Sequence, residues 1–173
     1  MPLIAFDSLP DDARVWVFGS SRALAPDERT RLLEEVDRYL GAWKAHGAPL
    51  TVGRQLLHDR FLVIGVDQST AGASGCSIDG LYRTLQHLEA ALRTVLLAGG
   101  RVFWRDGERI ATGDRAAFTQ HAAAGAVSAD TRVFDLTVTT AEAFRATFER
   151  PARATWHAQL LPPQRGADAF VEQ

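Results

Sequence analysis

Apolar residues recur along the chain with two different periods, and each period predicts a different kind of element. Residues 14–20, within ARVWVFGSSR, are rich in β-branched and aromatic residues and end near a glycine, which is typical of a strand. In residues 26–46 the apolar positions are three or four apart, which predicts a helix that starts at Pro26 and stops before Gly47. Its apolar face comprises Leu32, Leu33, Val36, Leu40 and Trp43.

A hairpin, a second helix and another hairpin follow in the pattern. Residues 50–57 and 60–66 predict a strand pair, and the second of these strands is apolar on both faces, which indicates a central strand of a sheet. After a loop of small and polar residues at 67–77, helical spacing runs from about residue 78 to Gly99-Gly100. Asp106-Gly107 then marks a hairpin turn.

The order of these elements predicts the fold class. Strand, helix, strand, strand, helix, strand is the order of the split βαβ, ferredoxin-like fold, in which one antiparallel sheet carries both helices on one face. We therefore expect an α+β protein with a ferredoxin-like core over residues 1–112.

The rest of the chain predicts a helix–strand–helix extension at 113–161, packed on the core within one domain. Its predicted elements are a helix at 115–124 capped by Asp114, a strand at 131–138, and a helix that opens with a capping box of Thr139 and Glu142 and ends at Pro151. The tail at 162–173 is expected to be flexible, while Trp156 holds the segment before it.

Composition and charge exclude several classes of protein. The 173 residues carry a net charge of −2, so no basic field points to nucleic acid or to an anionic membrane surface. The longest strongly apolar run is too short to cross a membrane, and no signal-peptide pattern is present. A single cysteine cannot form an internal disulfide, so we expect a cytoplasmic protein. Without a lysine-containing phosphate loop, a dinucleotide fingerprint or metal-ligand spacing, no cofactor or metal is expected.

The only cysteine, in SGCSIDG, is the main candidate for chemistry. Cys76 is predicted to lie where a glycine-rich loop meets the start of the second helix. The unpaired N–H groups there stabilise a thiolate, which would make Cys76 a nucleophile. The same groups can instead hold an anion, with Ser74, Gly75 and Ser77 as binding residues. A third interpretation is structural: Cys76 fills space and Ser74 or Ser77 caps the helix.

Three further residues are candidates for the same site. His46 is predicted to end the first helix, where it acts as a base toward Cys76 or only as a cap of the helix C-terminus. The expected topology places these two helix ends at opposite edges of the sheet, so it does not bring His46 and Cys76 together. Asp79 is expected in the first helical turn, as a charge that complements the helix dipole or as a third catalytic member. Asp67 borders the loop, as a ligand-binding carboxylate or a turn residue.

The segments WKAHG and ASGCSID also carry a resemblance. Roughly residues 1–110 resemble a family of small, uncharacterised bacterial proteins with the signature W-x-x-H-G, a strand pair and A-S-G-C-S-I-D. Some members are labelled ABC-transporter ATPases, a label that the missing phosphate loop does not support here. The matching positions are Trp43, His46, Gly47, Ser74, Gly75, Cys76, Ser77, Ile78 and Asp79. The resemblance implies a joint site of the two segments, with Trp43 as a ligand-binding candidate, and supplies no reaction.

Two functions of different classes follow. The first is a thiol enzyme for acyl or thioester transfer or hydrolysis, with Cys76 as nucleophile, the following N–H groups as oxyanion site, and His46 or Asp79 as base or orienting residue. The second is a non-enzymatic module that binds an anionic small molecule at the loop, or forms a homodimer through its sheet. In that module Cys76 has no catalytic role.

Overall fold

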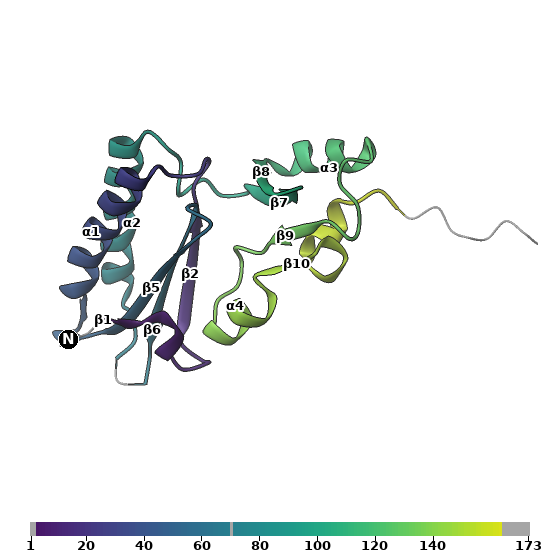
Figure 1. The fold of residues 1–173 in the computed structure, drawn as a ribbon. Coiled ribbons are helices and arrows are strands. Elements are labelled where there is room, and N and C mark those ends of the chain that lie inside the picture. Colours follow the sequence, from purple (N-terminus) through teal and green to yellow (C-terminus); the bar gives the residue numbers. More distant parts are fainter. Residues whose placement is uncertain (1–2, 70, 164–173) are drawn as a thin grey trace, which may run out of the picture. The chain divides into compact units, whose positions relative to one another are not determined.

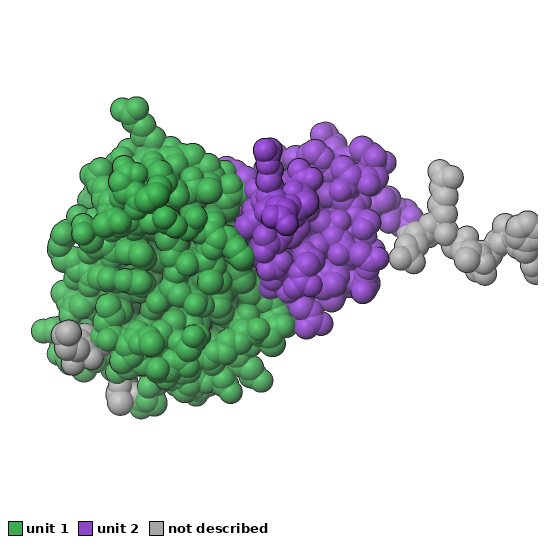
Figure 2. All heavy atoms as spheres, in the orientation of Figure 1, with its two compact units in different colours: residues 1–99, 135–148 green, residues 100–134, 149–173 purple. Residues whose placement is uncertain are grey.

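The computed structural model describes residues 3–69 and 71–163, which form two compact units (Figures 1 and 2). Unit 1 is built from the segments 1–99 and 135–148, and unit 2 from 100–134 and 149–173. The chain therefore passes between the units three times. This division differs from the predicted boundary at residue 112, which falls inside unit 2.

A four-stranded sheet forms the centre of unit 1. Its order is β1-β5-β6-β2, with β1 parallel to β5 and the other neighbours antiparallel. The strands are β1 (Leu3–Ala5), β2 (Arg14–Gly19), β5 (Thr51–Leu57) and β6 (Phe61–Asp67). Strand β6 is buried from Phe61 to Val66, so the prediction of a central strand covered on both faces is confirmed.

Two helices, α1 (Pro26–Gly41) and α2 (Gly75–Leu92), lie side by side on one face of this sheet (Figure 1). The core between them and the sheet contains Leu32, Val36, Leu40, Leu62, Ile64, Val66, Leu81 and Leu85. The other face carries a short 3-10 helix (Phe6–Ser8) and α4 (Ala141–Thr147), whose Phe6 and Phe144 rings meet at 5.4 Å. Gly65 leaves room for this cover, because a Cβ there would lie 2.4 Å from Cδ1 of Leu9.

Helix α1 starts where the sequence predicted and ends earlier. Pro26 occupies its start, and the Glu28 carboxylate accepts the N–H of Ala25 at 2.8 Å. The helix ends at Gly41 because the N–H of Trp43 bonds to the carbonyl of Leu40 in a tighter turn. The predicted end near residue 46 is therefore wrong.

A small hairpin of β3 (Lys44–Ala45) and β4 (Ala48–Pro49) follows α1. His46 and Gly47 form its turn, with φ of 51° and 83°. Both lie in the left-handed region that two-residue hairpin turns require. The interpretation of His46 as a cap of the α1 C-terminus is therefore wrong, and Gly47 serves the turn rather than the helix end.

Helix α2 is displaced toward the N-terminus relative to its prediction. It begins at Gly75, before the predicted residue 78, and ends at Leu92. Arg93 takes a left-handed conformation as C-cap, with φ 49°, so the chain leaves the helix before the glycines at 99 and 100. The carboxylate of Glu89 accepts hydrogen bonds from the N–H groups of Leu96 and Leu97. These bonds hold the apolar segment that follows α2 in a non-helical conformation.

A second four-stranded sheet forms the centre of unit 2, in the antiparallel order β10-β9-β7-β8. Its strands are β7 (Val102–Asp106), β8 (Arg109–Gly113), β9 (Arg132–Phe134) and β10 (Glu149–Pro151). Helix α3 (Arg115–Ala123) begins as predicted, with the Asp114 carboxylate accepting the N–H of Ala117 at 2.7 Å. Trp156 is half-buried against the apolar cluster of this unit.

The α+β class is confirmed, whereas the ferredoxin-like strand order is not observed. The order β2-β6-β5 agrees with that fold, but the fourth strand is β1, beside β5. The prediction counted β7 as the last strand of this sheet, yet both of its edges are hydrogen-bonded to β8 and β9. A strand with two partners has no free edge for a third, so β7 belongs to the other sheet.

The elements between β9 and β10 also differ from their prediction. Strand β9 stops at Phe134 because the chain then returns to unit 1. Thr140, and not Thr139, caps α4 by accepting the N–H of Ala143 at 3.1 Å. The helix ends at Thr147, and β10 lies between it and Pro151. The described residues end at 163, so most of the predicted tail lies outside them.

Candidate functional site

Two serines, Ser74 and Ser77, hydrogen-bond to each other in the first turn of α2. The Ser74 hydroxyl accepts the N–H of Ser77 at 3.3 Å, as an N-cap does, and the Ser77 hydroxyl donates to the carbonyl of Ser74 at 2.8 Å. Ser77 is buried, whereas Ser74 is half-buried. Both hydroxyl groups are thus engaged in the turn itself.

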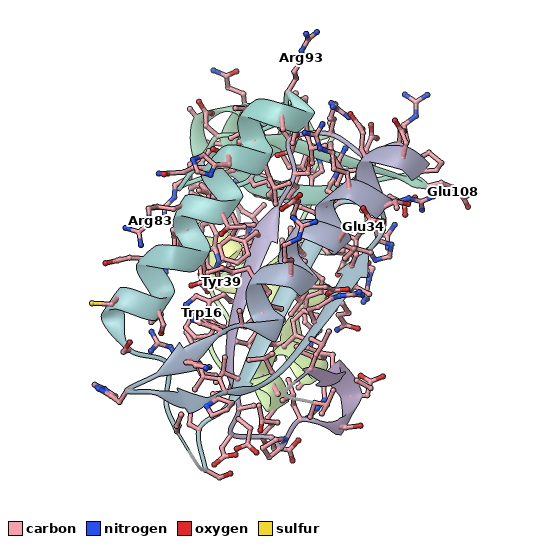
Figure 3. The ribbon with its side chains drawn as sticks, turned by 90° about the vertical axis from the view of Figure 1, so that its left-hand side faces the viewer. Trp16, Glu34, Tyr39, Arg83, Arg93 and Glu108 are labelled. Atoms are coloured by element: carbon pink, nitrogen blue, oxygen red, sulfur yellow. The ribbon has the colours of Figure 1, made fainter. Side chains whose placement is uncertain are left out.

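Two side chains from α1 and the residues just after it make hydrogen bonds to the same turn. The Tyr39 hydroxyl and the Trp43 indole N–H donate to the carbonyl of Ser77, at 2.6 and 3.0 Å. Trp43 is buried and its ring lies 6.1 Å from that of Trp16 on β2. Figure 3 shows Tyr39 and Trp16 beside the first turns of α2. Side chains from two other elements therefore pack around the start of this helix.

Gly80 makes this contact possible. A Cβ at Gly80 would lie 2.3 Å from the Tyr39 hydroxyl oxygen, well inside van der Waals contact. A glycine within a helix costs about 1 kcal/mol relative to alanine. In exchange, the phenol of Tyr39 can approach the backbone of α2 closely.

Burial affects the acidity of Tyr39. Removal from water disfavours the phenolate, which raises the pKa of Tyr39, while the positive charge of Arg83 opposes this rise. Arg83 is exposed on α2 and extends away from the helix in Figure 3. The phenol therefore stays a neutral hydrogen-bond donor at physiological pH.

Cys76, the residue before the buried Ser77, is exposed. Its thiol makes no hydrogen bond with any described residue. The backbone N–H groups of Gly75 and Cys76 likewise have no partner among the described residues, as expected for the first groups of a helix. The start of α2 thus presents a thiol and two amide donors at its surface.

The other candidate residues are not joined to Cys76. His46 is exposed in the β3–β4 turn, and within the described part of the chain it has no hydrogen bond or ion pair. Asp79 is exposed one turn into α2, beyond the first turn that was predicted for it. Asp67 accepts the N–H of Ser69 at 2.8 Å, a bond that lowers the pKa of Asp67 and fixes the start of the loop.

The structure does join the two sequence segments of the site, through a different pair of residues. Trp43 and Ser77 are in hydrogen-bond contact, whereas no bond links His46 with Cys76 among the described residues. Sequence reasoning missed Tyr39 and Gly80. The isolated glycine inside a helical pattern was the available signal, because such a glycine indicates a close approach of another group.

Neither a metal site nor a membrane span adds to this picture. Across 3–69 and 71–163, no group of three or more His, Cys, Asp or Glu side chains is arranged to hold a metal ion. Over the same ranges, no helix combines the length and the apolar composition needed to cross a bilayer. No family model, curated protein or solved structure matches the chain.

Proposed function

We propose that this chain is a non-enzymatic binding module, and that the start of α2 holds the anionic group of a small molecule. The proposal depends on the N–H groups of Gly75 and Cys76, which have no partner among the described residues. These groups lie on a helix turn whose Ser77 carbonyl accepts hydrogen bonds from Tyr39 and Trp43. A helix N-terminus attracts negative charge through its dipole and its free N–H groups. A turn that is already rigid loses little conformational entropy when a ligand binds.

The contacts of Cys76 favour binding over catalysis. A cysteine nucleophile is ordinarily activated by a base within hydrogen-bond reach, which a third group orients. Cys76 has no such contact with His46 or with Asp79 among the described residues. We therefore assign Cys76 to the rim of the site, without a chemical step.

A substitution at Gly75 separates the anion-binding role of the helix start from its role in beginning the helix. Proline is favoured at the first position of a helix and has no N–H, so Gly75→Pro removes one anion donor while the helix is kept. Ser74 already has the extended conformation that a following proline requires, with φ −82° and ψ 161°. Gly75→Ala is the matched control, because it keeps the N–H and its Cβ meets nothing within 4 Å.

The experiment is a titration of the ¹⁵N-labelled protein with phosphate, sulfate and acetate, followed by the amide signals of residues 75 and 76, and by that of residue 76 alone in Gly75→Pro. We expect saturable shifts with at least one anion, a severalfold weaker affinity for Gly75→Pro, and no change for Gly75→Ala. Absence of saturable shifts, or equal affinity of the proline and alanine variants, would refute the proposal.

A thiol enzyme is the second candidate, and the exposure of Cys76 is the observation that favours it. Its test is the rate of alkylation of the native protein by iodoacetamide as a function of pH. A midpoint well below the ordinary thiol value of about 8.5 supports a nucleophile. An ordinary midpoint, together with unchanged anion binding by Cys76→Ser, leaves the binding module as the function.

A further inference from the structure

The outer edge of β2 in unit 1 carries backbone groups that no other strand pairs. Along an antiparallel strand, one residue directs both its N–H and its C=O toward a given neighbouring strand, and the next residue directs both away from it. Val15 directs its N–H away from β6, since this group donates to the carbonyl of Thr139 at 2.8 Å. Val17 has the same orientation. Its N–H and C=O have no hydrogen-bond partner among the described residues.

Other segments close both ends of this free stretch. Thr139 takes the place of a neighbouring strand beside Val15. Beyond the end of β2, the N–H of Ser21 donates to the carbonyl of Val95 at 2.9 Å. A second copy of β2 paired along its whole length would need the position of Thr139, so edge-to-edge pairing that includes Val15 is blocked. Between the two closures, about 20 Å of strand leaves room for an extended segment of roughly three to five residues.

A groove of about 180 Å³ runs along the same edge. Trp16, Phe18 and Tyr82 line one wall, and residues 136–139 line the other. Tyr82 is 38% exposed although its ring packs edge-on against Phe18 at 5.7 Å. Exposed aromatic surface beside unpaired backbone groups suits an apolar side chain of an incoming strand.

A cation lies in the same groove. The guanidinium of Arg14 stacks over the ring of Trp16, 4.6 Å from its centroid. It makes no ion pair or hydrogen bond with any described residue. A stacked guanidinium is held in a fixed orientation and keeps its N–H groups for a carboxylate. Charge complementarity therefore selects an acidic partner.

We propose that this edge of β2 is a docking site for a short, extended peptide that carries a carboxylate. One peptide residue pairs with both backbone groups of Val17, an apolar side chain lies against Trp16 and Tyr82, and the carboxylate binds Arg14. This is recognition by strand addition, in which main-chain bonds give affinity and side-chain contacts give specificity. The inference is independent of the proposed anion site on α2.

The test uses a fluorescein-labelled peptide, Glu-Val-Phe-Val-Thr-amide, and the full-length protein in an anisotropy titration. Two companion peptides replace the glutamate by glutamine or the phenylalanine by proline, which cannot form the strand. Val17→Pro removes the outward N–H and leaves the bonds to β6 intact, and Val17→Thr is its matched control. Arg14→Gln removes the charge, and Arg109→Gln, outside the groove residues, controls for net charge.

We expect saturable binding of the acidic peptide and about tenfold weaker binding for Arg14→Gln and for Val17→Pro, as expected for loss of one hydrogen bond or charged contact. The control variants should bind normally. If Val17→Pro fails to fold, Arg14→Gln and the proline peptide still decide the question. Binding of the proline peptide as tight as that of the parent, or no binding at millimolar concentration, would overturn the proposal. A dimer in sedimentation that Arg14→Gln leaves intact and the peptide does not displace would overturn it in favour of self-association.

Discussion

The Tyr39 hydroxyl donates a 2.6 Å hydrogen bond to the backbone carbonyl of Ser77, 38 positions further along the chain. This bond joins the end of α1 to the first turn of α2. Trp43 donates to the same carbonyl, so two side chains hold one backbone atom. Both bonds hold the helix turn on which the exposed Cys76 lies.

Tyr39→Phe should destabilise unit 1 by about 1 kcal/mol at neutral pH, the usual net value of one hydrogen bond. Because burial raises the pKa of Tyr39, the folded state favours the neutral phenol. This stabilisation is complete below the unfolded pKa near 10 and is lost as the pH rises through the folded value. Urea unfolding at neutral and at alkaline pH should therefore show a stability difference that shrinks in the alkaline range. A pH-independent difference would contradict the assignment.

Gly80→Ala should be destabilising, although the same change in an ordinary helix interior gains about 1 kcal/mol. The added Cβ would lie 2.3 Å from the Tyr39 hydroxyl oxygen and displace the phenol. In the Tyr39→Phe background this oxygen is absent, so the cost of Gly80→Ala should decrease. Thermal or urea unfolding of the two single variants and the double variant measures this coupling. Equal costs in both backgrounds would show that the phenol does not require this glycine.

Ser74→Ala should cost about 1 kcal/mol, the typical value for loss of an N-cap. The bond lost is the one that the Ser74 hydroxyl accepts from the N–H of Ser77. Ser74→Asp keeps an acceptor at that place and should retain most of the stability. Urea unfolding of both variants tests this order, and an aspartate variant as unstable as the alanine variant would speak against capping.

Glu28 should make the stability of unit 1 sensitive to acid. Hydrogen bonds from the Arg22 guanidinium, and then from the N–H of Ala25, lower the pKa of Glu28 to about 2. A lowered carboxyl pKa contributes stability that is present above the unfolded value of 4.5 and is lost as the pH falls toward 2. Glu28→Gln should therefore be less stable than the parent at pH 7, and this difference should close at low pH.

The control for Glu28 is Glu34→Gln, on the same helix. The side chain of Glu34 is exposed and makes no hydrogen bond within the described part of the chain. Its substitution should leave the urea midpoint nearly unchanged at both ends of the pH range. A Glu28→Gln midpoint that follows the parent at every pH would show that the Arg22 contact carries no net stability.

The sequence by itself determined the elements whose signals are local. The apolar run of β6, the helical spacing and Pro26 of α1, and the Asp114 cap of α3 depend on backbone preferences within a few residues. These preferences act before any long-range contact forms, so the pattern alone indicates them. The α+β class follows from their order.

Only the tertiary structure decided where those elements pair. The sequence order allowed β7 to complete the first sheet, but hydrogen bonds with β8 and β9 place it in the second. At the candidate site, too, local pattern and tertiary packing determined different features. Local pattern placed Cys76 at a helix start, whereas packing of Tyr39 and Trp43 against Ser77, rather than a contact with His46, determined its surroundings. Contacts across 30 to 40 positions depend on the shape of the whole core, which no local preference encodes.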